Sequence, residues 1–225
     1  MDAVKEKRVY DVFNIDNLYN HQRKSLTAVT EKKDVFLSTK TTTPLVFDDD
    51  NSVIVVISPL VPIMKEQVIF LNAMGFSATY IGRDKKENVG IEDGKFTFVF
   101  SSPEILLGDQ KWRNVMLSNR PKLRLIVSDG ADTMLQWCIV DYISFYLVDL
   151  LSKCSFLLLP GESHMVLKSL LENGLHMGEV RSLCPGTPLM VLTARAGPKN
   201  REKIYRKLYL VNPLEIVENI DRPKH

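Results

Sequence analysis

The amino-acid sequence predicts an α/β layered fold built on a mainly parallel β-sheet. Short apolar runs rich in Val, Ile, Leu and Phe alternate with segments of helical spacing, which is the pattern of strands and covering helices in such folds. Several runs are nearly continuous rather than alternating, as expected for parallel strands covered on both faces. Ligands of such sheets bind at the carboxyl ends of the strands, so the loops after the strands are the candidate functional segments.

The predicted elements follow one another in a regular order. A helix at Leu18–Glu31 precedes the first strand, Asp34–Leu37, and the second strand, Val53–Ile57, precedes a helix at Val61–Met74. Apolar residues stand near helical spacing in this second helix, and Gly75 provides its C-terminal stop. The remaining strands are predicted at Ala78–Ile81, Thr97–Phe100, Leu123–Val127 and Leu189–Thr193, and the remaining helices at Pro103–Leu107 extended by Lys111–Leu117, at Val166–Asn173 and at Pro198–Leu208.

Composition sets limits on the class of protein. A chain of 225 residues with 45% hydrophobic and 25% charged residues has enough apolar surface for one large or two small domains, and it is neither disordered nor collagen-like. The formal net charge of +2 excludes wholesale electrostatic coating of nucleic acid but leaves room for a local basic groove. The mixed-sign run from Arg83 to Glu87 is interpreted as a solvated loop.

Cysteine usage and the first residues indicate an intracellular protein. The three cysteines, Cys138, Cys154 and Cys184, form no CxxC pair and are expected to be reduced, partly buried thiols. The chain begins with a charged segment and without an apolar h-region, so no secretory signal is expected.

One apolar stretch has the length of a membrane span. It covers Ile139–Leu159 but contains Asp141, Asp149 and Lys153, and each such charge costs about 2.5–3.5 kcal/mol near a bilayer centre. A buried or misplaced helix is therefore favoured over a transmembrane helix, and no membrane contact is expected.

Five short motifs follow the predicted elements in a particular order. They are NHQR at 20–23, SPLVPIMKEQV at 58–68, SPE at 102–104, LTARA at 192–196 and IDRP at 220–223. In this order and at these offsets the series resembles the first RecA-like lobe of the RecQ family of superfamily 2 DNA helicases. The resemblance implies a three-layer RecA-like fold of the P-loop NTPase type, with residues 1–223 forming a single ATP-binding lobe and the second helicase lobe absent.

The resemblance also implies a function and its cofactors. The family unwinds DNA with 3′–5′ polarity by hydrolysing Mg-ATP between two lobes, which makes DNA (a single strand or a fork) the expected partner and the nucleus the expected location. Gln22 matches the family's adenine-reading glutamine. Ser58, Lys65, Ser102 and Thr193 occupy positions where helicases grip the phosphates of one strand, although simple helix caps account for such hydroxyls equally well.

The phosphate-binding loop departs from the family's TGxGKS motif. With Thr39 aligned, Lys40 and Thr42 occupy the positions of the two glycines, and Thr43 and Pro44 replace the lysine and the metal-binding serine. Side chains at the glycine positions crowd the anion site, and proline removes an N–H donor. Thr39, Lys40, Thr42 and Thr43 therefore remain the nucleotide-binding candidates, with Lys40 as an alternative cation, and ATP turnover is expected to be negligible.

The acidic motif is also altered. Asp129 keeps the family's Mg²⁺-binding position, but Gly130 replaces the glutamate that positions water. A second candidate, GESH, lies at 161–164. An insert at 138–160, genuine or mis-spliced, explains both copies. Asp129 could then form one site with Glu162 and His164, or these two residues are ordinary surface residues.

The remaining residues indicate no other chemistry. His21, His176 and His225 lack the spacing of a metal cluster. The sequence therefore predicts the N-terminal lobe of a RecQ-like helicase with degraded catalysis. The alternative is a non-catalytic remnant that binds nucleic acid or a helicase partner, and a decaying gene product without function is a third reading.

Overall fold

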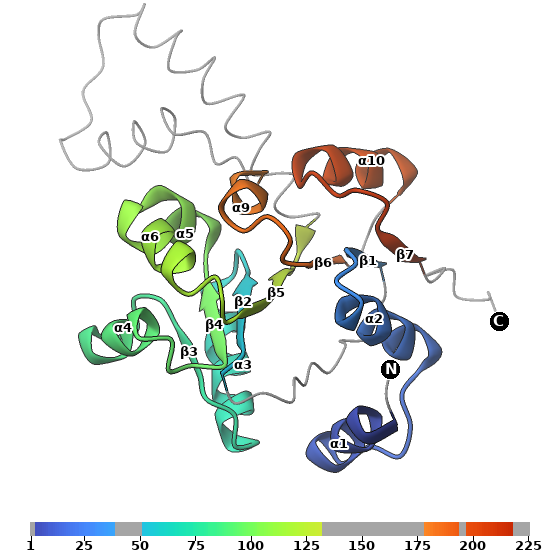
Figure 1. Cartoon of the computed structure of the whole chain (residues 1–225), viewed down its shortest axis with the longest axis horizontal. Coiled ribbons are helices and arrows are strands. Elements are labelled where there is room, and N and C mark those ends of the chain that lie inside the picture. The colour runs from blue at the N-terminus through green and yellow to red at the C-terminus, as the bar shows by residue number, and fades with distance from the viewer. Residues whose placement is uncertain (1–2, 39–50, 132–177, 194–196, 218–225) are drawn as a thin grey trace, which may run out of the picture.

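A computed structural model describes residues 3–38, 51–131, 178–193 and 197–217, which form one parallel sheet with helices on both faces (Figure 1). The sheet has seven strands in the order β3-β4-β2-β5-β6-β1-β7, and all its pairings are parallel. The predicted α/β fold with a mainly parallel sheet is therefore confirmed. The strands are β1 (Val35–Ser38), β2 (Val53–Ile57), β3 (Ala78–Tyr80), β4 (Phe98–Ser101), β5 (Leu123–Ser128), β6 (Leu189–Thr193) and β7 (Leu214–Val217).

Each face of the sheet is covered by its own set of helices. Successive residues of a strand point to opposite faces, so Val55 and Ile57 pack into one apolar cluster while Ile54 and Val56 pack into the other. The first cluster is closed by α4 (Lys85–Glu92), α5 (Pro103–Gly108), α6 (Gln110–Ser118), α9 (Gly178–Leu183) and α10 (Pro198–Lys207). The second is closed by α2 (Asn20–Thr30) and α3 (Val61–Ala73).

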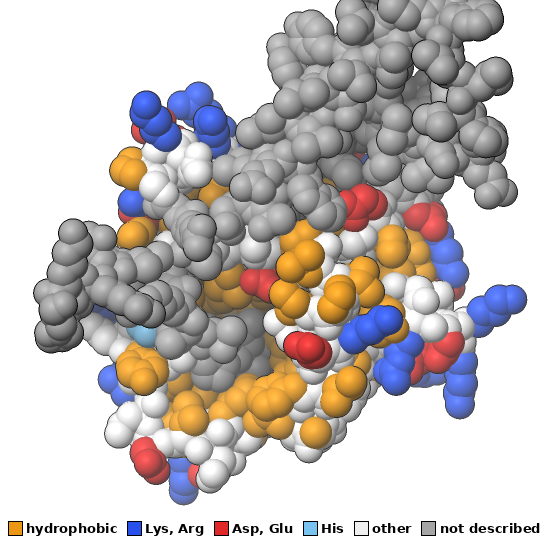
Figure 2. All heavy atoms as spheres, turned by 180° about the vertical axis from the view of Figure 1, so that it is seen from behind, with side chains coloured by type: hydrophobic (Ala, Val, Ile, Leu, Met, Phe, Trp, Pro, Cys, Tyr) orange, Lys and Arg blue, Asp and Glu red, His pale blue; other side chains and the backbone are white. Residues whose placement is uncertain are grey.

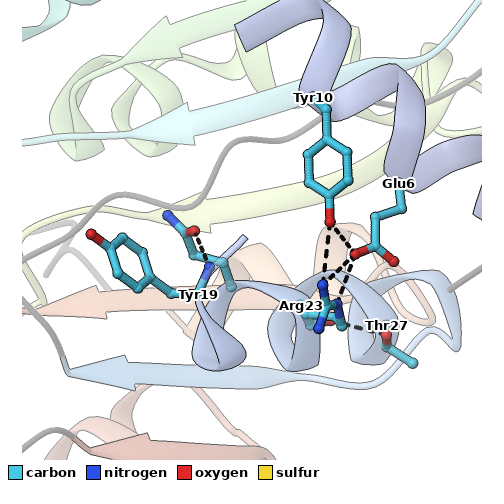
Figure 3. Close-up of polar contacts among 6 residues, drawn as sticks. Glu6, Tyr10, Tyr19, Arg23 and Thr27 are labelled. Carbon is cyan, nitrogen blue, oxygen red and sulfur yellow. Dashed lines mark hydrogen bonds and ion pairs between the residues drawn. The ribbon is translucent and has the colours of Figure 1, made fainter. Parts of the chain in front are cut away.

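The first helix, α1 (Ala3–Phe13), packs on α2 rather than on the sheet. Val9 is buried against Leu18 and Leu26. Figure 3 shows Glu6 and Tyr10 pointing from α1 toward Arg23 of α2, whose Nε lies 2.8 Å from the Glu6 carboxylate. Hydrogen bonds from Tyr10 and Arg23 hold the pKa of Glu6 below its ordinary value, which indicates that this carboxylate is charged where the two helices meet.

Two sequence expectations are corrected by the described residues. The run from Arg83 to Glu87 is not a loop throughout, because Asp84 accepts a hydrogen bond from the Glu87 N–H at 2.8 Å and starts α4. The helix expected at Pro103–Leu107 with an extension at Lys111–Leu117 is two separate helices, α5 and α6. Asp109 ends α5 in an extended conformation and accepts from the Lys111 N–H at 2.8 Å, which caps α6.

Four elements were not expected from the sequence, and some expected features lie outside the described residues. The additional elements are α1, α4, α9 and β7. The predicted helix Val166–Asn173, the insert at 138–160, the IDRP motif and the apolar stretch Ile139–Leu159 all fall outside the described ranges. Among the helices that are described, none is long and apolar enough to cross a bilayer.

A half-buried ion pair joins three elements at the amino end of the sheet. Both oxygens of Asp34, just before β1, lie 2.7 Å from Nη2 of Arg181 in α9. Asp34 also accepts from the Leu189 N–H at 2.9 Å, and Arg181 donates to the Thr187 carbonyl at 2.9 Å. The Arg181 and Asp34 side chains are only 23% and 10% exposed. This pair therefore fixes α9 and the start of β6 to the start of β1.

We expect Arg181→Met to lower the free energy of unfolding by about 2–4 kcal/mol, because it leaves the Asp34 carboxylate buried with fewer partners. Arg206→Met is the matched control, since its pair with Glu202 is 80% and 71% exposed and such pairs contribute little. Urea unfolding measures both variants. Equal stabilities of the two would contradict the assignment of the Asp34–Arg181 pair as a structural clamp.

The thiol of Cys184 is fully buried between α9 and the sheet. Burial raises its pKa from 9.0 to about 11, although Arg120 and Arg181 pull in the opposite direction. Burial of Cys184 agrees with the expectation of a buried thiol, whereas Cys138 and Cys154 lie outside the described residues.

The raised pKa of Cys184 gives stability a pH dependence. The unfolded chain loses the thiol proton at lower pH than the folded chain does, so stability falls as pH rises from about 9 to about 11. We expect the melting temperature to fall more steeply across this window in the wild type than in Cys184→Ala. Parallel curves for the two proteins would be inconsistent with a buried, protonated thiol.

Candidate functional site

The carboxyl ends of three adjacent strands form a row of hydroxyl-bearing residues. The register aligns Ile57 at the end of β2 with Ser101 of β4 on one side and Ser128 of β5 on the other. One residue further along, the Ser58 N–H donates to the Ser101 carbonyl at 3.0 Å, and the Asp129 N–H donates to the Ile57 carbonyl at 2.9 Å. We call Ser102, Ser58 and Asp129, which follow β4, β2 and β5, the strand-end row.

Two further hydroxyls continue the same edge of the sheet. Thr193 ends β6 and is paired in register with Ser38 at the end of β1. Both side chains are buried, with exposed fractions of 4% and 2%. The parallel topology thus brings Ser58, Ser102 and Thr193 to one edge, as the sequence predicted.

Each member of the strand-end row has a distinct local role. Ser102 is the N-cap of α5, and its hydroxyl oxygen accepts from the Ile105 N–H at 3.4 Å, so one of its functions is the helix cap foreseen from the sequence. Ser58 is 1% exposed and lies two residues before the N-cap of α3, Leu60. Lys65 lies exposed on α3, which follows directly from this loop.

The described part of the loop after β5 contains Asp129 and a glycine with a left-handed backbone. Asp129 is half-buried, and Gly130 adopts a φ of +68°, a region that L side chains rarely occupy. The family glutamate therefore could not be restored at position 130 without backbone strain. Asp129 fits a Mg²⁺ ligand in kind and position, but among the described residues no cluster of three or more metal-ligating side chains occurs.

A separate groove of about 510 Å³ lies between the start of α2 and the edge strand β7. Tyr19, Asn20, His21 and Lys24 line one side, and residues 214–217 line the other. Val217 is in register with Ser38, so the groove reaches the carboxyl edge of the sheet.

Two stacked aromatic side chains, Tyr19 and His21, form part of one wall of this groove. The Tyr19 and His21 rings are stacked, with centroids 5.5 Å apart and planes inclined by 6°. His21 is 8% exposed whereas Tyr19 is 65% exposed. The buried His21 ring therefore supports the Tyr19 ring, which is exposed to solvent. An exposed, supported ring of this kind is suited to stacking on a planar base.

Gln22 occupies the third position of α2, beside the residues that line this groove. Its side-chain oxygen accepts from the Tyr19 N–H at 3.0 Å, which forms half of a capping box. Gln22 thereby fixes the backbone that carries Tyr19. The sequence singled out Gln22 but missed Tyr19, whose signal was an exposed aromatic residue directly before the NHQR motif.

The remaining candidates cannot be placed. Thr39, Lys40, Thr42 and Thr43 of the phosphate loop, and Glu162 of the second acidic motif, lie outside the described residues. The described parts of the candidate site are thus the strand-end row with Lys65 and Thr193, and the groove at α2 and β7.

Comparisons with known proteins point to helicases. No family model matches the chain. It is 25% identical over 173 residues to the ATP-dependent DNA helicase RecQ of Pasteurella multocida, and 26% identical over 179 residues to the ATP-dependent helicase wrn-1 of Caenorhabditis elegans. These matches cover 75% and 76% of this chain but only 22% and 14% of the relatives.

Solved structures give the same fold. The helicase MrfA bound to DNA and AMPPNP superposes with a TM-score of 0.64 at 14% identity, covering 97% of this chain and 29% of MrfA. A hypothetical ATP-dependent RNA helicase from Sulfolobus tokodaii gives a TM-score of 0.57 at 15% identity, covering 96% of this chain and 57% of that protein. The chain therefore has the three-layer, P-loop-type fold of a RecA-like helicase lobe.

The positive φ of Gly130 generates a prediction. We expect Gly130→Ala to destabilise the protein by about 1–2 kcal/mol, since a Cβ is disfavoured in this region. Gly108→Ala is the matched control, because Gly108 ends α5 with open space where a Cβ would be placed. If thermal unfolding ranks Gly108→Ala as the less stable variant, the backbone assigned to Gly130 is wrong.

Proposed function

We propose that this chain is a helicase-type lobe that binds single-stranded nucleic acid across the carboxyl edge of its sheet. The observation that carries the proposal is the strand-end row, which places the hydroxyl-bearing Ser102 and Ser58 and the acidic Asp129 at the ends of three adjacent strands along one edge. The RecA-like fold and the weak similarity to DNA helicases support it.

The chemistry of this edge suits a phosphate backbone. Ser58, Ser102 and Thr193 bring hydroxyl groups to this edge, and the exposed Lys65 adds a positive charge on the helix that follows Ser58. Such contacts give affinity without sequence information. Binding is therefore proposed to be indifferent to base sequence and strongly dependent on salt.

Nucleotide binding is proposed along the part of the same edge that runs from Asp129, after β5, to the groove at α2 and β7. A purine base can stack on the exposed ring of Tyr19 in the groove at α2 and β7. Asp129 would hold the Mg²⁺ of Mg-ATP, which supplies charge neutralisation at the phosphates. Hydrolysis is proposed to be negligible because Gly130 has no carboxylate to orient water, and because Thr43 and Pro44 stand where the family has lysine and serine.

The domain organisation of the chain is part of the same proposal. The chain spans about a fifth of the length of the RecQ relative and less of wrn-1. We propose that residues 1–223 form one lobe with an insert at 138–160. RecQ-type specificity, 3′–5′ polarity, DNA repair and a nuclear location would be properties of a complete helicase.

A second candidate function is docking onto a partner helicase without catalysis. The observation that favours it is exposed apolar surface on α3, where Ile69 and Phe70 are 69% and 58% exposed. Hydrophobic side chains are visible on this face of the molecule in Figure 2. Docking of this kind would depend little on salt, in contrast to phosphate binding.

A salt titration separates the two candidates. We expect an oligothymidylate to bind with an affinity that falls steeply as salt is raised, and Lys65→Gln to weaken binding several-fold and to reduce the slope of log K against log salt by about 0.7. Lys86→Gln, at another exposed lysine on α4, is the control and should change neither quantity.

Fluorescence anisotropy measures the titration, and phosphate release measures Mg-ATP turnover. Binding that is independent of salt would favour the partner-docking function. Hydrolysis stimulated by the oligonucleotide would contradict the proposed loss of catalysis while leaving the binding surface intact.

A further inference from the structure

Positive charge on the described part of the molecule is concentrated on one short helix, α10. The helix α10 contains five basic residues and one acidic residue, a net charge of +4, whereas the whole chain carries +2. The rest of the chain is therefore net acidic by two charges. Figure 2 shows Lys and Arg side chains gathered over α10, at the upper left of that view.

The basic residues of α10 are divided between two faces. Ile204 is buried, and Tyr205 packs edge-on against Phe36 with ring centroids 5.2 Å apart. Arg201 also faces inward, where it pairs with Glu215 of β7. These contacts fix the rotation of the helix on the sheet.

The opposite face of α10 points away from the sheet. Lys199, Lys203 and Arg206 fall within an arc of about 60° at 3.6 residues per turn, and all three are exposed. We call them the outer face of α10. At 1.5 Å per residue they extend over about 10 Å, the length of about three base-pair steps of duplex.

Neighbouring carboxylates neutralise other basic residues but not these lysines. Around α4 and α6, Arg83 pairs with Glu87 and Lys111 pairs with Glu92. Within the described part of the chain no ion pair is formed by Lys199 or Lys203, and Arg206 makes only an exposed contact of 3.3 Å with Glu202. Among the described residues, the Glu202 carboxylate is thus the one group that pairs with the outer face.

The composition of the outer face distinguishes among anionic partners. A single strand is usually held by aromatic side chains as well as charges, and a membrane surface requires apolar side chains that enter the lipid. The exposed positions from Lys199 to Lys207 contain neither kind of residue. A helical stripe of three cationic side chains with one adjacent carboxylate, Glu202, is suited to the phosphates of a double helix.

The position of α10 connects this stripe to the proposed strand site. Thr193 ends β6 at the carboxyl edge, and Lys199 follows six positions later in the first turn of α10. The helix then returns along the sheet to β7, which is parallel to β1. A duplex continuing from a strand bound at the carboxyl edge would thus meet Lys199 first and Arg206 last.

We propose that the outer face of α10 binds the phosphate backbone of duplex nucleic acid adjoining the single strand. This inference rests on the proposed function, because the strand site sets where the duplex begins. It assigns to Lys199, Lys203 and Arg206 a contact that is separate from the strand-end row and independent of nucleotide.

The test compares a triple variant with a matched control. Lys199→Gln, Lys203→Gln and Arg206→Gln together remove the outer face, whereas Lys32→Gln, Lys85→Gln and Lys86→Gln remove the same charge from other exposed positions. Each protein is titrated with an oligothymidylate, with a duplex bearing the same sequence as a single-stranded tail, and with phosphatidylserine vesicles. Circular dichroism melting confirms that both variants are folded.

We expect the outer-face variant to bind the tailed duplex about tenfold or more weakly and to lose about 2.7 from its salt slope, which corresponds to three phosphate contacts. Its affinity for the oligothymidylate should stay within about twofold of the wild type, and the control should match the wild type on both ligands.

Three results would overturn the inference. The first is that the outer-face variant binds the tailed duplex as tightly as the wild type does. The second is that the control variant loses as much affinity for the tailed duplex as the outer-face variant does. The third is that the outer-face variant loses binding to the vesicles but keeps binding to the duplex. Failure of the wild type to bind the oligothymidylate would instead refute the proposed function itself. The two failures are therefore distinguishable.

Discussion

Parallel pairing of the strands is the constraint on which the rest of the structure depends. Every strand of a parallel sheet must be reached by a crossover and covered on both faces, which accounts for two separate apolar clusters on opposite sides of the same strands. The same constraint brings the carboxyl ends of all strands to one edge. Residues as distant in sequence as Ser58 and Thr193 therefore lie along that edge, and the Asp34–Arg181 pair closes the opposite end by joining segments 147 residues apart.

Much of the sheet could be predicted because its strands are buried on both faces. β2 and β6 begin and end at the predicted residues, since continuous apolar runs leave little choice of boundary. β7 could not be predicted in this way, because Glu215 alternates with half-buried neighbours at an edge of the sheet. The start of α4 was missed because Asp84 was grouped with a charged run, although its capping hydrogen bond determines the structure. Tertiary packing of Gly90 and Ile91 completes that helix.

The sequence predicted which edge of the sheet carries the candidate residues, but it did not predict the side-chain geometry at that edge. The order of loops after strands identified Ser58, Ser102 and Asp129, and their alignment follows from parallel register alone. The stacking of Tyr19 on His21 required coordinates, because ring geometry is set by the turn into α2. Gln22 was expected to contact an adenine base, and in the structure its side chain accepts a hydrogen bond from the Tyr19 N–H at the start of α2. The left-handed backbone at position 130 explains why glycine is favoured there over the family's glutamate, which the sequence alone does not explain.

The central claim is that the carboxyl edge of this RecA-like lobe is where nucleic acid binds. Backbone hydrogen exchange with and without bound oligothymidylate measures this directly, since it reports the location of contact rather than affinity alone. We predict slower exchange in the loop and first turns at 58–65 and at the start of α5, with β3 and α4 unchanged. Exchange that is unaltered along the carboxyl edge while the oligonucleotide is bound would contradict the account.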